Sequence, residues 1–105
     1  MKRIATITKL KPDQKEEYIS LHEKIWKDVV GIGHAANQRN FTIFSCGDYL
    51  FSYFEYIGED YDTDMLNKKA QPVIQKWAKT TGEYLDDVVE GTRIIELEEV
   101  WHCDF

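Results

Sequence analysis

The sequence predicts an α+β fold, in which an antiparallel sheet carries helices on one face. Three observations predict it. Apolar and β-branched residues alternate with a period of two near both ends and in the middle of the chain, and between those segments apolar residues recur at helical spacing. A length of 105 residues gives one domain, 1–105, and a hydrophobic content of 43% supplies its core, which excludes intrinsic disorder.

The first expected elements are a strand and a long helix. The strand covers residues 2–10, where KRIATITKL alternates. One helix is expected over 12–30, because Pro12 suits a first helical turn and a stripe of side chains follows at spacings of three and four: Tyr18, Leu21, His22, Ile25, Trp26 and Val29. Gly31 and Gly33 are expected to end this helix, since glycine accepts a left-handed conformation.

The remainder of the chain predicts a hairpin, two helices and a last strand. Residues 40–46 and 49–57 are rich in aromatic and β-branched residues and are separated by Gly47 and Asp48, a spacing typical of a hairpin. Asp62 is expected to cap a helix over 63–70, and Pro72 to begin another over 72–84. An acidic loop, 85–91, leads to a strand over 92–101.

This order of elements is the ferredoxin-like split βαβ plan, with an antiparallel sheet and helices on one face. Strands 40–46 and 49–57 carry aromatic residues on both sides, so the face without helices is expected to be apolar. A symmetric dimer packed sheet to sheet would cover that face. The sequence therefore predicts a homodimer.

Charge and motif content exclude several classes of function. A net charge of −6 disfavours nucleic acid and anionic membrane surfaces as partners. The first ten residues contain no apolar run of the length of a signal peptide or membrane span, so a cytoplasmic location is expected. Cys46 and Cys103 are expected to be free thiols. No nucleotide, metal or nucleophile-elbow motif is present, so neither a metal nor a cofactor is expected.

The expected first helix contains the main candidate for chemistry. Tyr18, His22 and Trp26 follow one another at intervals of four residues and would share one face. Such a stripe is either a core-facing surface with a hydrogen-bonded histidine or the wall of a cleft. In a cleft, His22 would give and take a proton near neutral pH, and Tyr18 would bind a ligand hydroxyl.

Two further segments contain candidate sugar-binding residues. Tyr53 and Glu55 alternate onto one face of the third expected strand, where Glu55 is either an ion-paired surface group or a ligand for sugar hydroxyls. Trp77 in the last helix is either a core residue or a platform on which a sugar ring stacks. Proton transfer in an aromatic, hydroxyl-lined pocket and binding without chemistry both remain open on these residues.

Five segments together resemble a known family: EEYISLHEKIW (16–26), NFTIF (40–44), YLFSYFEYIGEDYDTDM (49–65), PVIQKWAKTT (72–81) and LEEVWHCDF (97–105). They resemble the L-rhamnose mutarotase family, small cofactor-free enzymes of the dimeric ferredoxin-like type. The resemblance implies that His22 is the proton donor and that Tyr18 contacts the sugar. It also places Phe41 where the family has a sugar-contacting tyrosine, and Trp77-Ala78 where the family often has two tryptophans.

The reaction implied by the resemblance is interconversion of the α and β anomers of a neutral pyranose through ring opening. The departures at Phe41 and Ala78 leave the sugar open between L-rhamnose and a related 6-deoxy hexose such as L-fucose. Glu55 is the candidate for a second proton-transferring or hydroxyl-binding group. Two other classes remain: a non-catalytic sugar-binding or dimerisation module, and a small dimeric monooxygenase or haem-binding protein of the same fold, with His22 or His34 as iron ligand or acid.

Overall fold

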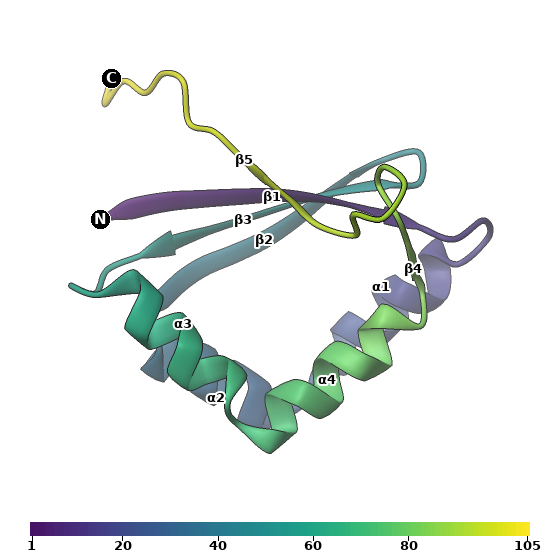
Figure 1. The fold of residues 1–105 in the computed structure, drawn as a ribbon, viewed down its shortest axis with the longest axis horizontal. Coiled ribbons are helices and arrows are strands. Elements are labelled where there is room, and N and C mark those ends of the chain that lie inside the picture. The colour runs from purple at the N-terminus through teal and green to yellow at the C-terminus, as the bar shows by residue number, and fades with distance from the viewer.

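The computed structural model describes residues 1–105 and consists of one antiparallel sheet of five strands and four helices. The strands lie in one layer, and all four helices lie against the same side of that layer (Figure 1). The predicted α+β class is therefore confirmed. None of the helices is long and apolar enough to cross a membrane.

The sheet has the ferredoxin-like strand order. β1 (Lys2–Leu10) is central and pairs on one side with β3 (Tyr49–Tyr56), which in turn pairs with β2 (Gln38–Cys46). On its other side β1 pairs with two short strands, β4 (Leu85–Asp86) and β5 (Ile95–Leu97). The resulting order, β2-β3-β1-β4, places the two strands of the expected hairpin at one edge.

The prediction of one continuous helix over 12–30 is wrong. The chain forms α1 (Lys15–Glu23) and α2 (Lys27–Ala35), with a break between them. Trp26 takes an extended conformation, φ −66° and ψ 134°, and its ring then packs against Trp77 at a centroid distance of 5.0 Å. No glycine or proline marks this break in the sequence. The contact that accompanies it, between Trp26 and Trp77, joins residues that are distant in sequence.

The expected helix end at Gly31 and Gly33 is also wrong, since both glycines lie inside α2. The left-handed residue that follows this helix is Asn37, with φ 67°. Asparagine accepts this conformation more readily than most residues. The Asn37 side-chain amide donates to Asp64, which lies 27 residues further along the chain in the later helix α3 (Tyr61–Lys69).

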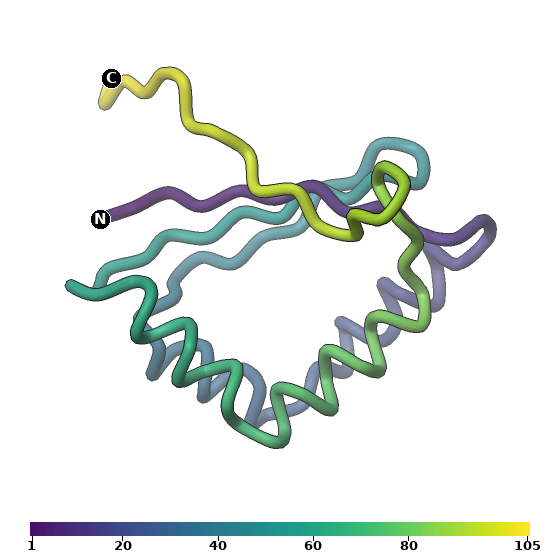
Figure 2. Tube along the Cα trace, viewed as in Figure 1, coloured from purple at the N-terminus to yellow at the C-terminus, as the bar shows by residue number.

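The second half of the chain departs from the prediction at the start of α3, in the expected loop 85–91, where residues 85–86 form β4, and in the last strand. α3 (Tyr61–Lys69) begins earlier than expected, because Asp60 rather than Asp62 is its cap and accepts from the backbone N–H of Thr63 at 3.1 Å. α4 (Pro72–Gly82) starts at the predicted proline. The last strand is limited to β5, and the segment 98–105 leaves the sheet and projects away from it (Figure 2).

The core consists of two small clusters between the sheet and the helices. One contains Leu10, Tyr18, Leu50 and Leu85, and the other contains Ile4, Phe54 and Tyr56. The residues contributed by β1 and β3 are those that alternate toward the helices. The first cluster positions α1, and with it Tyr18, against the hairpin strands.

A partly buried polar cluster attaches α3 to the end of β3. The Tyr56 hydroxyl donates to Asp64 at 2.5 Å, and the side-chain amide of Asn37 donates to the same oxygen at 3.0 Å. These two hydrogen bonds hold the pKa of Asp64 below its usual value, with the bond from Tyr56 the larger cause. Burial, followed by the bond to Asp64, raises the pKa of Tyr56 to about 12. Both groups therefore keep their roles of donor and acceptor across the neutral range.

Gly58 lies against this cluster, and replacing it is expected to destabilise the fold. A Cβ atom there would overlap the Tyr56 hydroxyl and lie 2.7 Å from the Asn37 amide nitrogen. Gly58→Ala should lower the free energy of unfolding by about 1–3 kcal/mol through overpacking, measured by urea denaturation. Gly31→Ala is the matched control, because a Cβ at Gly31 meets nothing within 4 Å. Equal stability of the two variants would contradict the close approach at Gly58.

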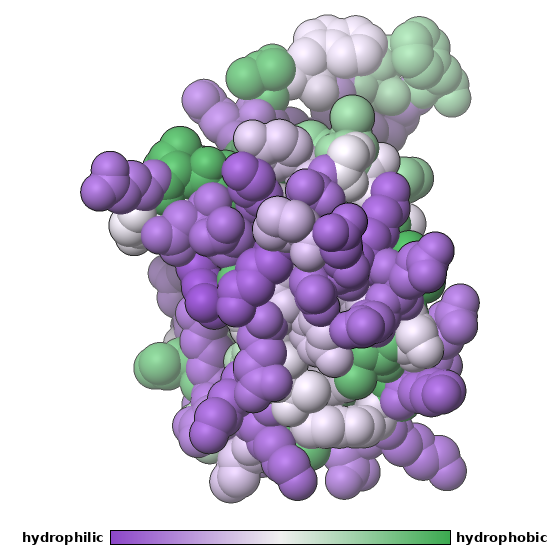
Figure 3. Space-filling model, turned by 90° about the vertical axis from the view of Figure 1, so that its right-hand side faces the viewer, coloured by the Kyte–Doolittle hydropathy of each residue, from purple (hydrophilic) through white to green (hydrophobic).

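One face of the sheet has no helix over it. We call it the open face and define it by the residues that alternate away from the helices: Arg3, Ala5, Ile7, Lys9, Thr42, Phe44, Cys46, Tyr49, Phe51, Tyr53, Glu55, Ile95 and Leu97. Phe44, Phe51, Ile7 and Ile95 form an uninterrupted apolar row across four strands. Figure 3 shows the molecule from the right-hand side of Figure 1: hydrophilic residues cover most of this side, and hydrophobic residues lie at its top and along its margins.

Candidate active site

A cavity of about 300 Å³ lies between α1 and the hairpin strands β2 and β3. One face of α1 supplies five of its lining residues at helical spacing: Lys15, Tyr18, Ile19, His22 and Glu23. The strands supply Ile43, Ser45 and Leu50 from the helix side of the sheet, and also Phe44, which borders the cavity although it alternates to the open face. The volume lies at the lower end of the range for small-molecule sites in proteins.

His22 has a defined orientation at this cavity. Its Nδ1 atom lies 2.9 Å from the backbone carbonyl oxygen of Tyr18, one turn earlier in α1. A carbonyl oxygen only accepts, so Nδ1 carries a hydrogen and donates it. This leaves Nε2 as the atom that can exchange a proton with a bound molecule: as an acceptor when the ring is neutral, and as a donor when it is charged.

Aromatic rings surround His22 on two sides. The Tyr18 ring lies 4.4 Å away, and the Trp77 ring of α4 lies 5.3 Å away in an edge-to-face arrangement. Trp77 also contacts Trp26, which in turn lies under the ammonium group of Lys76 at 5.6 Å from the ring centre. The structure therefore brings together Tyr18, His22, Trp26 and Trp77, four of the residues that the sequence singled out.

Tyr18 is buried, and its hydroxyl remains protonated. Burial raises the pKa of Tyr18 above its ordinary value, because ionisation in a poorly solvated site is disfavoured. A protonated phenol both donates and accepts a hydrogen bond. Tyr18 can therefore bind a neutral hydroxyl group next to His22.

Phe41 and Ala78 lie apart from this group of four. Ala78 follows Trp77 on α4 and is exposed. Phe41 stacks on Phe54 of β3 with ring centres 5.7 Å apart and is 56% exposed. Phe54 faces the helices in the second core cluster, so Phe41 stands on the same side of the sheet as His22.

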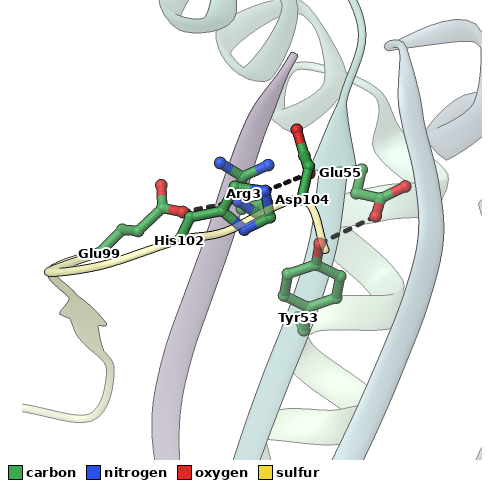
Figure 4. Close-up of polar contacts among 6 residues, drawn as sticks. All are labelled: Arg3, Tyr53, Glu55, Glu99, His102 and Asp104. Carbon is green, nitrogen blue, oxygen red and sulfur yellow. Dashed lines mark hydrogen bonds and ion pairs between the residues drawn. The ribbon is translucent and has the colours of Figure 1, made fainter.

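Tyr53 and Glu55 share one face of β3, as the alternation predicted, but that face is the open face. The Tyr53 hydroxyl donates to Glu55 at 2.9 Å, and Arg3 beside them forms an ion pair with Glu99 at 2.6 Å (Figure 4). The sheet separates these side chains from His22. Within one chain, Glu55 therefore does not lie with His22, as a second proton-transferring group would have to.

Several lining residues were missed by the sequence analysis. Lys15, Ile19 and Glu23 lie on the same face of α1 as Tyr18 and His22, so helical periodicity alone was enough to find them. Ile43 and Ser45 had no such signal, because the side of the sheet that they face depends on an irregularity in β2. No group of three or more His, Cys, Asp and Glu side chains is arranged to hold a metal ion.

The fold and this site define a small ferredoxin-like α+β protein with a histidine at a cavity between its sheet and α1, next to the rings of Tyr18 and Trp77. The L-rhamnose mutarotase family profile matches residues 3–103. The chain belongs to the L-rhamnose mutarotase family, an isomerase-class family of enzymes, as the resemblance of its motifs implied.

Individual relatives agree with this assignment. The L-rhamnose mutarotase of Listeria monocytogenes serovar 1/2a is 30% identical over 97% of this chain and 98% of its own length. The crystal structure of the L-rhamnose mutarotase of Formosa agariphila superposes with a TM-score of 0.80 at 20% identity, covering 99% of this chain and all of that one. Tetracenomycin F2 cyclase from Streptomyces glaucescens has the same fold, with a TM-score of 0.72, 15% identity and coverage of 98% and 99%. The fold alone therefore does not define the reaction.

Proposed function

We propose that this protein interconverts the α and β anomers of L-rhamnose, with Nε2 of His22 as the atom that transfers the proton. One observation carries this role: the hydrogen bond from Nδ1 to the Tyr18 carbonyl leaves Nε2 as the free ring nitrogen at the cavity. Membership of the mutarotase family supports the choice of reaction. We propose a cytoplasmic location as well, because Cys46 and Cys103 are both exposed free thiols, as is typical of proteins in reducing compartments.

The proposed reaction needs only the movement of protons. The charged His22 ring donates its Nε2 proton to the ring oxygen of the sugar, the bond between that oxygen and the anomeric carbon breaks, and a water molecule takes the proton of the anomeric hydroxyl. The product is the open-chain aldehyde. Rotation of the aldehyde followed by the reverse transfers closes the ring as the other anomer, so no atom is gained or lost.

Aromatic surface and hydroxyl groups suit a neutral deoxy sugar. We assign the stacking surface to Trp26 and Trp77, which are in contact beside His22, and the hydroxyl contact to Tyr18. Phe41 lies on the same side of the sheet and offers a ring without a hydroxyl. Ala78 leaves the space next to Trp77 open. A net charge of −6 favours a neutral sugar over a sugar phosphate.

Saturation-transfer NMR tests the reaction directly. Irradiation of one anomeric proton of L-rhamnose should lower the signal of the other anomer when the protein is present at catalytic concentration. L-Fucose, a 6-deoxy hexose of different hydroxyl configuration, is the parallel substrate, and we expect slower transfer with it. Faster exchange of L-fucose would reassign the substrate. Binding of either sugar without faster exchange would identify a non-catalytic sugar-binding module instead.

We also propose that two copies pack through their open faces. The chain exposes 7545 Å² of surface, and a monomeric protein of 12.4 kDa is expected to expose about 6,100 Å². The excess of about 1,400 Å² exceeds the roughly 800 Å² that each partner buries in an interface of standard size. The apolar row formed by Phe44, Phe51, Ile7 and Ile95 supplies the surface that such an interface would bury.

A further inference from the structure

Strand β2 contains a β-bulge at its start. Asn40 and Phe41 together lie opposite the single residue Phe54 of β3, because the pairing shifts by one residue between Arg39 and Thr42. Asn40 has a φ of 55°, which is a left-handed conformation. Asparagine adopts this conformation several-fold more often than most residues, and β-branched residues avoid it.

The extra residue reverses which side of the sheet the rest of β2 faces. Gln38, before the bulge, is buried on the helix side opposite Tyr56. Strict alternation from Gln38 would turn Phe41, Ile43 and Ser45 to the open face. The bulge turns them toward the helices instead, where Ile43 and Ser45 line the cavity and Ile43 packs on the first core cluster.

Side chains on the open face hold Asn40 in place. The Asn40 side-chain amide donates to one carboxylate oxygen of Glu55 at 2.7 Å, and the Tyr53 hydroxyl donates to the other at 2.9 Å. The Thr42 hydroxyl donates to the carbonyl oxygen of Asn40 at 3.0 Å. The hydrogen bonds from Asn40 and then Tyr53 hold the pKa of Glu55 below its ordinary value, so the carboxylate stays ionised at neutral pH.

We infer that Asn40 and Glu55 are positioning residues for the β2 wall of the active-site cavity. Glu55 fixes the side chain of Asn40, Asn40 supplies the left-handed residue of the bulge, and the bulge turns Phe41 and Ile43 toward the cavity side. The inference rests on the proposed function, in which the sugar binds in the cavity that Ile43 and Ser45 line. Glu55 thus acts through the sheet from its opposite face and touches no reacting atom.

The expected signature is weaker sugar binding with little change in turnover, because His22 is held on α1 by the backbone of α1 itself. Asn40→Val, a side chain that avoids positive φ, should raise KM about tenfold and change kcat less than about threefold. Asn40→Gly keeps access to positive φ and should retain the wild-type KM within about threefold. Asn67→Val on α3 is the matched control, since Asn67 has no positive φ.

Glu55 is tested by a pair of variants. Glu55→Ala removes the acceptor for Asn40 and should raise KM in the same manner as Asn40→Val. Glu55→Gln should restore a low KM, because its amide oxygen accepts from Asn40 while its NH₂ group donates to the Tyr53 hydroxyl. A Glu55→Gln variant as impaired as Glu55→Ala, or a loss confined to kcat, would overturn the inference.

A readout independent of activity separates this inference from the proposed function. The stacked rings of Phe41 and Phe54, 5.7 Å apart, should give nuclear Overhauser effects between their ring protons in the wild type. These effects should persist in Asn40→Gly and Glu55→Gln and disappear in Asn40→Val and Glu55→Ala. Their persistence in all four variants would overturn the positioning role even if the protein is an active mutarotase. Their loss as expected would support it even if L-rhamnose is not the substrate.

Discussion

His22→Ala is expected to lower the rate of anomer exchange by about 100- to 10,000-fold, the range typical of one general acid or base. The reason is the fixed orientation of the ring. Because Nδ1 donates to the Tyr18 carbonyl oxygen at 2.9 Å, proton exchange with the sugar takes place at Nε2. Saturation transfer between the two anomeric protons of L-rhamnose measures the rate. His22 is half-buried, so the variant should keep most of the stability of the wild type.

His34→Ala is the matched control for this experiment. His34 is exposed near the end of α2, and only its backbone carbonyl is used, as an acceptor from the Arg39 side chain and from the backbone N–H of Asn37. We expect the His34 variant to exchange the anomers at the wild-type rate. Anomer exchange at the full wild-type rate in His22→Ala would exclude His22 as the proton-transferring residue. Loss of exchange in His34→Ala alone would assign that role to His34 instead.

Phe44→Glu is expected to convert the proposed dimer into monomers. Phe44 is 62% exposed in the single chain and begins the apolar row across the open face. In a sheet-to-sheet dimer the new carboxylate would be buried without a partner in each copy, a cost of several kcal/mol per charge. Sedimentation equilibrium or light scattering after size exclusion would report the change of mass.

Leu66→Glu provides the comparison for this second prediction. Leu66 is 69% exposed on α3, on the helix side of the molecule, so the same change of charge there should leave the mass unaltered. If the wild type is already a monomer at micromolar concentration, or if both variants dissociate alike, the open face is not the interface.

Patterns of short range predicted most of the fold. The alternation in β1 and β3, the Gly47-Asp48 turn and the proline at the start of α4 each act within a few residues, so the sequence shows them directly. The same holds for the face of α1 that carries Tyr18 and His22. The prediction failed at the break between α1 and α2 and at the irregularity in β2, where contacts distant in sequence accompany the local conformation, and at the start of α3, where Asp60 rather than Asp62 is the cap.

Trp26 is one example of that failure. Its extended conformation divides the expected helix into α1 and α2. In this conformation the Trp26 ring contacts Trp77, which lies about fifty residues later in α4. Residues 24–26 contain no helix-breaking type, so no local rule predicts the division.

The sequence by itself determined the α+β class, the face of α1 that holds the candidate histidine, and the face that Tyr53 and Glu55 share. Only the tertiary structure decided that this shared face lies across the sheet from His22, and that Phe41, Ile43 and Ser45 face the helices. Packing of α1 on the Leu50 and Leu10 side of the sheet decides the first point, and one extra residue at Asn40 decides the second. Side chains of a strand alternate with a period of two, so one bulge reverses the facing of every residue beyond it, and its place is set by pairing with β3 rather than by β2 alone.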